Sequence, residues 1–207
     1  MLKIDKIQKQ TSKRLEKRTA KKNELADSAV EVLSQLGYAR TSLRDIAQHS
    51  GVSVGVLHYY FEDRIDLISY CTLRYKTEFA QMLEATLVGG GTHRQIIEAF
   101  ICALVDAIDK DADKHRMWYD IRAQALFDEN FHETIDEIED LQIDIVRRFI
   151  SLLGIEGVDP LSVFLTLDGT FRHFLKKRLR DDPDALTAFR KALMEMFENN
   201  DRLSANM

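Results

Sequence analysis

Residues 42–61 read Ser-Leu-Arg-Asp-Ile-Ala-Gln-His-Ser-Gly-Val-Ser-Val-Gly-Val-Leu-His-Tyr-Tyr-Phe, and this order of capping, apolar and small residues decides the local fold. Ser42 is a helix-capping residue, and Asp45 follows three positions later, where its carboxylate lies over the positive end of the helix dipole. Ser53 supplies a second N-cap. Gly51 separates the two segments and accepts the left-handed backbone that a tight turn can require. The stretch therefore predicts two short helices joined by a turn.

The flanking sequence adds a helix on either side. From Lys21 onward apolar residues recur at helical period, and Gly37 ends that helix as a C-terminal glycine. On the other side, a break at Glu62-Asp63 opens a long helix over about residues 64–88. Three helices, two of them very short and joined by a glycine-containing turn, are typical of a helix-turn-helix DNA-binding module. The outer positions of its third helix are then free to face a major groove.

The rest of the chain also has a helical pattern. Thr92 and Gln95 form a predicted capping box, and Asp-Pro pairs at Asp159 and Asp182 open two further helices. Only 2 of the 207 residues are proline, which argues against an all-β fold with its frequent turns. We therefore predict an all-α protein, with C-terminal helices over about residues 92–108, 114–126, 133–153, 160–180 and 183–198.

The charge is distributed unevenly along the chain. Residues 1–64 carry a net charge of +4, whereas residues 65–207 carry −9, against −5 overall. A locally basic end on an acidic protein fits a nucleic-acid contact confined to one module, although a solvated leader has the same composition. We predict a basic N-terminal arm (1–18), a helix-turn-helix domain (19–64) and a helical effector-binding and dimerisation domain (65–207).

Several features bear on the cellular compartment. No apolar run approaches the roughly 18–20 residues of a membrane span, and the charged N-terminus lacks the apolar segment of a signal peptide. Cys71 and Cys102 fall in apolar helical stretches, where buried free thiols are usual. The sequence therefore favours a cytoplasmic protein with no membrane partner and no disulfide.

Reactive constellations are missing from the sequence. The six histidines form no His-x-x-x-His pair, and the pair His132 and Asp136 is a poor metal site on its own. Gly89-Gly90-Gly91 lacks the following lysine of a phosphate-binding loop, and no Gly-x-Ser-x-Gly motif occurs. We predict no enzymatic activity, no metal site and no cofactor.

The motif at residues 42–61 resembles the DNA-binding motif of the TetR family of bacterial transcriptional regulators. It joins Arg-Asp-Ile-Ala, Gly-Val-Ser, a further glycine and Tyr-Phe at fixed separations. The continuation into Arg64, Leu67 and Ile68 is similar to the fourth helix of that family, so the resemblance covers roughly residues 20–70. It implies a homodimer in which a ligand-binding domain controls the spacing of two DNA-binding heads.

The resemblance carries DNA contacts onto particular residues. Arg44 takes a position that implies a base or phosphate contact, and its alternative is a surface ion pair with Asp45. Gly55 lets the backbone approach a duplex closely. Arg64 matches a basic position that often grips the DNA backbone, with an ion pair to a neighbouring carboxylate as the alternative. His58 departs from the tyrosine that many members carry. The predicted DNA-binding residues are Ser42, Arg44, Ser53, Val54, Gly55, His58, Tyr59 and Arg64.

An effector pocket is expected in the C-terminal domain, although aromatic residues at helical spacing also form ordinary cores. Trp118 and Tyr119 beside Arg122 would suit an amphipathic or cationic ligand. The wording Val-Leu-His-Tyr-Tyr-Phe-Glu-Asp at residues 56–63 resembles the choline-responsive BetI-like branch of the family. The predicted pocket residues are Phe79, Phe100, Trp118, Tyr119 and Arg122.

The last two helices carry wide apolar stripes, which include Leu161 and Leu165. Two such stripes on adjacent antiparallel helices favour pairing with a second copy, although they could also close the domain's own core. The predicted interface residues are Phe164, Phe171, Phe174, Phe189 and Leu193.

These observations predict a ligand-responsive transcriptional regulator, a repressor that binds a pseudo-palindromic operator as a homodimer. Its partners would be double-stranded operator DNA, a second copy of the chain and a small-molecule effector of unknown identity. An activator, or a regulator without a small ligand, has the same sequence features. An all-α enzyme and a helical scaffold whose head binds protein are the rivals from other classes.

Overall fold

The computed structural model describes the backbone of residues 2–204 and the side chains of residues 12–197. All regular structure in that range is helical, which confirms the predicted fold class. The chain divides into two compact units between Thr72 and Leu73. This division falls inside a helix, whereas the sequence placed the domain boundary at the start of that helix. No described helix has the length and apolar character that crossing a bilayer requires.

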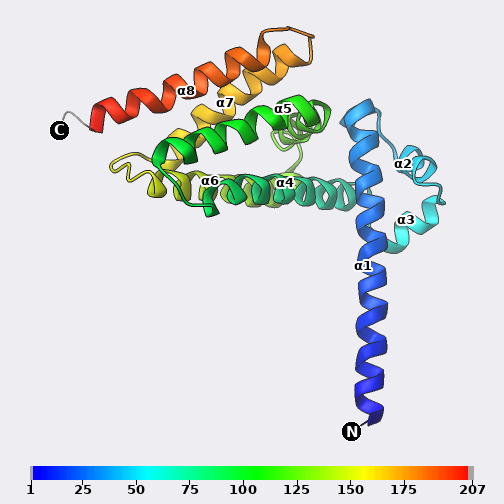
Figure 1. Ribbon diagram of the computed structural model, residues 1–207. Coiled ribbons are helices and arrows are strands. Elements are labelled where there is room, and N and C mark those ends of the chain that lie inside the picture. The colour runs from blue at the N-terminus through cyan, green and yellow to red at the C-terminus, as the bar shows by residue number, and fades with distance from the viewer. Residues whose placement is uncertain (1, 205–207) are drawn as a thin grey trace. The chain divides into compact units, whose positions relative to one another are not determined.

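The N-terminal unit is built on the long helix α1 (Leu2–Leu36); the short helix α2 (Leu43–His49) packs on α1, and α3 (Val54–Tyr60) packs on α2 (Figure 1). A 3-10 turn, η1 (Tyr38–Arg40), links α1 to α2, and α4 (Arg64–Val88) follows α3. Residues 2–18, predicted as a separate arm, form the first half of α1. The side chains of Lys3, Lys6 and Lys9 in that arm lie outside the described residues. The core of the unit consists of Leu25, Ala29, Leu33, Ile46, Leu57 and Phe61, each at most 2% exposed.

The predicted turn chemistry is present in this unit. Gly37 and Gly51 have φ angles of 78° and 64°, in the left-handed region where a side chain would be strained. A Cβ on Gly51 would meet nothing within 4 Å, so the backbone conformation alone requires glycine there. Ser42 and Ser53 cap α2 and α3 through their side-chain oxygens. The short helices are therefore positioned by local sequence.

Arg64, the first residue of α4, is turned into the N-terminal unit. Its Nε donates to the carbonyl oxygen of Thr41 at 2.9 Å, its Nη2 donates to that of Tyr38, and its guanidinium lies 4.1 Å from the centre of the Tyr38 ring. The sequence did not predict these internal contacts of Arg64, and its contact with DNA stays a prediction. The guanidinium ties the η1 segment to the start of α4.

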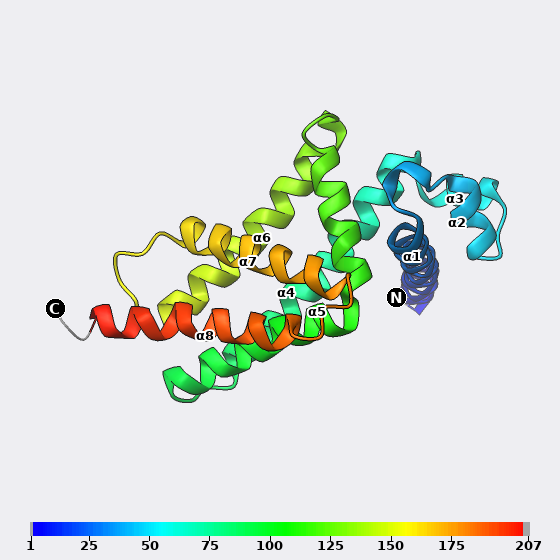
Figure 2. The same ribbon diagram turned by 90° about the horizontal axis from the view of Figure 1, so that it is seen from above.

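The C-terminal unit contains the rest of α4 together with α5 (His93–Gln124), α6 (His132–Leu152), α7 (Pro160–Arg178) and α8 (Ala185–Ser204). A short 3-10 turn, η2 (Glu129–Phe131), precedes α6. The sequence predicted two helices within α5, and the structure has one helix whose backbone is non-helical at Asp111, with φ −126° and ψ 27°. Figure 2 shows α7 and α8 lying side by side.

The aromatic stripes of α7 and α8 face inward, which corrects the predicted interface. Phe164, Phe171, Phe189 and Leu193 are 0–7% exposed and belong to one core with Phe100 and Phe149, while Phe174 is half-buried against it. Because α5, α6 and α8 all pack on α7, a single chain covers the stripe that seemed too wide for one neighbour. The exposed apolar residues of α7 are Leu161 and Leu165.

The two cysteines differ in their surroundings. Both thiols are free, as the sequence predicted. Cys71 is buried, and that burial raises the pKa of its thiol to about 12. Cys102 is exposed, contrary to expectation, and its sulfur accepts a hydrogen bond from Arg190 at 2.9 Å.

Replacing Arg64 tests its internal role. Arg64→Met removes the donors to two backbone carbonyls, so we expect the free energy of unfolding to fall by about 2 kcal/mol in urea titrations followed by circular dichroism. Arg44→Met is the matched control, because Arg44 is exposed and its loss should change stability by no more than about 0.5 kcal/mol. Equal stability of the two variants would contradict the assignment.

Candidate DNA-binding surface and ligand cavity

The outer edge of α3 is an exposed surface held on a buried anchor. Leu57 is 1% exposed and fixes the helix in the core, whereas Tyr59 on the opposite side is 63% exposed. Ser53, Gly55 and His58 are exposed beside it, and Val54 is half-buried. A Cβ on Gly55 would meet only Ser53 Oγ, at 3.7 Å. Of the five residues predicted on this helix, Gly55, His58 and Tyr59 therefore lie on the side away from Leu57, while Ser53 and Val54 lie at the start of the helix.

A complete capping box holds the start of α2. Ser42 Oγ accepts from the backbone N–H of Asp45 at 3.3 Å, and Asp45 Oδ2 accepts from the backbone N–H of Ser42 at 2.8 Å and from its hydroxyl. These hydrogen bonds hold the pKa of Asp45 below its usual value. Arg44 lies in the same first turn and is exposed. Ser42 and Arg44 thus stand where the sequence predicted them, on the outside of the module.

Two basic residues of α1 lie next to α3, although Arg18 belongs to the predicted N-terminal arm and neither residue was among the predicted DNA-binding residues. Arg18 lies over the ring of Tyr59, with its guanidinium carbon 5.6 Å from the ring centre. Lys22 lies 4.7 Å from the ring centre of Phe61 and 4.1 Å from that of Tyr70. Arg18 therefore brings positive charge from α1 to the side of α3 that carries Tyr59.

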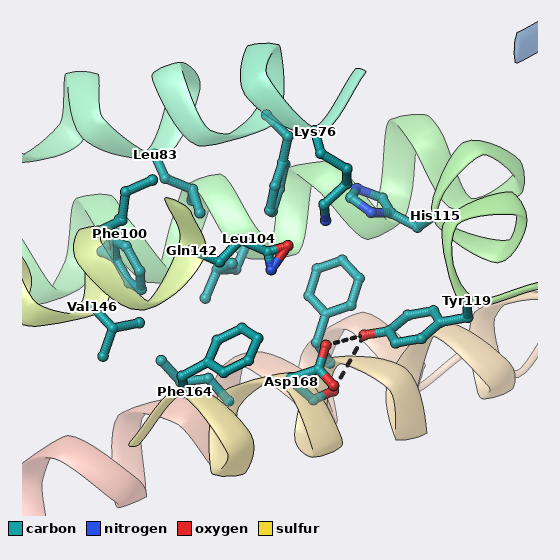
Figure 3. A pocket seen from close by; sticks show the side chains of 14 residues that line it. Lys76, Leu83, Phe100, Leu104, His115, Tyr119, Gln142, Val146, Phe164 and Asp168 are labelled. Carbon is teal, nitrogen blue, oxygen red and sulfur yellow. Dashed lines mark hydrogen bonds between the residues drawn. The ribbon is translucent and has the colours of Figure 1, made fainter. Parts of the chain in front are cut away.

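The C-terminal unit has a partly open cavity between α4, α5, α6 and α7 (Figure 3), with about 510 Å³ of empty space when the solvent at its mouth is included. Most of its wall is apolar. The break at Asp111 divides the contribution of α5, so that Phe100 and Leu104 come from one half and His115 and Tyr119 from the other. The polar residues in the wall are Lys76, His115, Tyr119, Gln142 and Asp168.

Lys76 is the cation of this wall and is nearly enclosed, with 3% of its surface exposed. Its ammonium lies 4.4 Å from the ring centre of Phe79 and 4.8 Å from that of Trp118. Within the described side chains no carboxylate forms an ion pair with it. Burial disfavours the charged form and lowers the pKa of Lys76 to about 7, although Asp168 opposes the shift.

Asp168 is fully engaged on the other side of the cavity. Its Oδ1 accepts from the Tyr119 hydroxyl at 2.8 Å, and its Oδ2 accepts from Arg122 Nη1 at 2.7 Å. Arg122 also donates from Nε to Glu139 at 2.6 Å. Burial, together with the neighbouring Asp168 carboxylate, raises the pKa of Tyr119, so its hydroxyl remains a donor.

The structure separates the five predicted pocket residues. Phe79, Phe100 and Tyr119 line the cavity, whereas Trp118 is packed in the core. Arg122 is not part of the wall and donates a hydrogen bond to Asp168, which is. Sequence reasoning missed the polar residues Lys76, His115, Gln142 and Asp168. One sequence feature could have revealed Lys76, because it is a lysine on the apolar side of the predicted 64–88 helix. Among the described residues, no group of three or more His, Cys, Asp or Glu side chains is arranged to hold a metal ion.

Comparison with known proteins gives one family match. The model of the family described as bacterial regulatory proteins, tetR family, matches residues 25–71, which include α2, α3 and the start of α4. The transcriptional repressor BepR of Brucella suis is 24% identical over 62% of this chain and 62% of its own length. The regulator BetI of Proteus mirabilis is 22% identical over 54% of this chain and 57% of its own length. The chain thus spans about three fifths of the curated relatives it matches.

A solved structure supports the same fold. A transcriptional regulator from Saccharomonospora viridis, crystallised with choline, superposes with a TM-score of 0.74 over 88% of this chain and 97% of that protein, at 16% sequence identity. At this level of identity, the likeness shows a shared all-helical fold. Residues 25–71 are thus similar to the DNA-binding domain of the TetR family of bacterial regulatory proteins, and the match to that family lies in this part of the chain.

Proposed function

We propose that the protein is a repressor that binds a pseudo-palindromic operator as a homodimer and releases it when a small molecule occupies the cavity. The observation that carries the proposal is the accessible face of α3, which is anchored by Leu57 and preceded by a capped α2. A short helix presented in this way fits the major groove of B-DNA.

Two parts of each DNA-binding head, the start of α2 and the outer side of α3, would contact the operator. Arg44 is exposed in the first turn of α2, where a guanidinium can bind guanine O6 and N7 in bidentate fashion. On α3, Val54 suits contact with a thymine methyl group, and His58 and Tyr59 supply donors to phosphates. Arg18 beside Tyr59 adds a positive charge for the DNA backbone.

A second copy is required because one head reads only a half-site, and the two heads must lie roughly 34–36 Å apart to meet successive major grooves. The exposed side of α7 is the surface we assign to this pairing. Leu161 and Leu165 are 46% and 52% exposed there, and Gly169 on the same side has open space around its Cα. A glycine in mid-helix costs about 1 kcal/mol relative to alanine, and a close helix–helix approach offsets that cost.

Helix α4 provides the link between ligand and DNA. Its middle supplies Lys76, Phe79 and Leu83 to the cavity wall, and its first residue, Arg64, holds the η1 segment of the head. A ligand that shifts α4 would therefore move the head with it. The ligand favours release only to the extent that it binds the shifted state more tightly.

Arg44 provides the first test of DNA reading. Arg44→Ala should weaken binding to the operator by about 1–3 kcal/mol and leave binding to random DNA almost unchanged. Titrations at several salt concentrations should show a negative log–log slope of about 0.9 for each phosphate neutralised. Equal losses on operator and random DNA would assign Arg44 to the backbone, and a flat salt response would count against DNA binding by the head.

Gly55 allows stability and DNA binding to be separated. Because a Cβ there meets only one side chain, and at an ordinary distance, Gly55→Ala should stabilise α3 by up to about 1 kcal/mol. The added methyl group would nevertheless keep the helix backbone from the duplex and lower operator affinity at least fivefold, on the order of 1 kcal/mol. Thermal melting and operator titration of one preparation measure both. Unchanged operator affinity would remove Gly55 from the contact surface.

Leu165 tests the proposed pairing surface. Leu165→Glu places a charge on the exposed side of α7, so sedimentation should show monomers at low micromolar concentration while the helical circular dichroism is retained. Operator affinity should fall with dimerisation. Val88→Glu, at another exposed apolar residue, is the matched control and should remain dimeric. A dimeric Leu165→Glu protein with normal operator binding would show that this side of α7 is not the interface.

A further inference from the structure

Three polar side chains meet the cavity without partners of their own. Lys76 from α4, His115 from α5 and Gln142 from α6 all point toward its interior (Figure 3). Neither ring nitrogen of His115 has a hydrogen-bond partner, and Gln142 Oε1 has none. Buried polar groups are almost always hydrogen-bonded, so a group left without a partner in a cavity wall points to a ligand that supplies one.

Lys76 is the strongest of these signals. A buried ammonium costs several kcal/mol unless an anion accompanies it. The carboxylate nearest in the cavity wall, Asp168, already accepts from Tyr119 and Arg122 and forms no ion pair with Lys76. Two aromatic rings are the only partners that the described part of the chain gives to the ammonium. A ligand in the cavity can therefore supply the negative charge that the Lys76 ammonium lacks.

The same contacts argue against a cationic ligand. A cation would be stabilised by an aromatic face or a carboxylate, and the protein's own cations already occupy the Asp168 carboxylate and three nearby aromatic faces. Lys76 lies over Phe79 and Trp118, and Arg172 lies 6.0 Å from the ring centre of Tyr119. The cationic ligand that Trp118, Tyr119 and Arg122 suggested in the sequence is not favoured by these contacts.

We propose that the ligand of this cavity is an apolar molecule that carries a single carboxylate, and that the carboxylate binds Lys76 Nζ. The inference rests on the proposed function, since it names the chemical class of the effector. His115 lies near Lys76, and its neutral ring donates a further hydrogen bond to the same carboxylate from one nitrogen. The apolar part of the ligand packs against the wall formed by Leu83, Phe100, Leu104, Val146 and Phe164.

Proton uptake gives this pairing a signature. The charged or titratable groups around Lys76 are Asp168 on α7, and Arg122 and His115 on α5, with Tyr75 on α4. Burial holds the pKa of His115 well below its usual value, so His115 is neutral above pH 7. In the empty cavity Lys76 loses its proton above about pH 7, whereas a bound carboxylate raises its pKa. Carboxylate binding therefore takes up a proton above pH 7.

The test compares three probes with the same ten-carbon chain by calorimetric titration of the full-length protein. Decanoate carries an anionic head, decanol a neutral one and decyltrimethylammonium a cationic one. We expect decanoate to bind at least tenfold more tightly than either of the others at pH 7. Its affinity should fall as the pH rises from 7 to 9, approaching about tenfold per unit, while that of decanol should not change. The proposal is overturned if decyltrimethylammonium binds more tightly than decanoate, or if the three head groups give the same affinity.

Two variants of Lys76 sharpen the test. Lys76→Met should abolish the preference for decanoate over decanol and its pH dependence, whereas Lys76→Arg, which stays charged, should keep the preference and lose the pH dependence. Without ligand, Lys76→Met should be more stable than the parent protein, and the gain should be larger at pH 6 than at pH 9. The folded-state pKa is the depressed one, so the penalty of the buried charge is greatest below pH 7. A variant that binds decanoate as the parent does would exclude Lys76 as its partner.

The readouts distinguish this inference from the proposed function. Operator binding of the ligand-free protein is measured on the same preparation. If the ligand-free protein does not bind operator specifically, the proposed function is wrong, but the preference of the cavity for one head group can still hold. Specific DNA binding together with a cavity that prefers cations, neutral molecules or none of the three probes would overturn the ligand class alone.

Discussion

Helix α4 contributes buried residues to both units of the chain. Leu67, Ile68 and Cys71 are at most 1% exposed and contribute to the N-terminal unit, while Leu83 and Leu87 are buried in the C-terminal core. Because an α-helix repeats every 3.6 residues, Leu83 and Leu87 lie on the same side of α4 as Lys76. One helix thus supplies Arg64 to the head and Lys76 to the cavity.

Lys76 interrupts this apolar face and gives the cavity its character. A methionine or leucine there would complete the core at lower cost, since burying an ammonium without an anion is unfavourable. Asp168 does not relieve that cost directly, because Tyr119 and Arg122 engage both of its oxygens. On one side of the cavity wall the Asp168 carboxylate is fully hydrogen-bonded, and on the other side the Lys76 ammonium has no anionic partner. Its preference among ligands follows from that asymmetry.

Tertiary contacts also decided the roles of residues that looked alike in the sequence. Arg44 and Arg64 both follow a helix start in the head, yet Arg44 is exposed and Arg64 binds the carbonyls of Tyr38 and Thr41. Phe171 and Leu165 belong to the same apolar stripe of α7, and only Leu165 remains accessible. Helical periodicity predicts which residues share a face, but it does not say how many neighbouring helices cover that face.

The sequence by itself determined the local structure of the head. Ser42 and Ser53 cap their helices, and Gly37 and Gly51 take the left-handed backbone, because these features depend on residues only a few positions apart. Phe79, Phe100 and Tyr119 were also predicted correctly as lining residues. Only the tertiary structure brought Lys76, His115, Gln142 and Asp168 to one cavity, and only it withdrew Trp118 and Arg122 from the wall. Those residues come from four helices, and their distances depend on long-range packing that periodicity along a single helix does not contain.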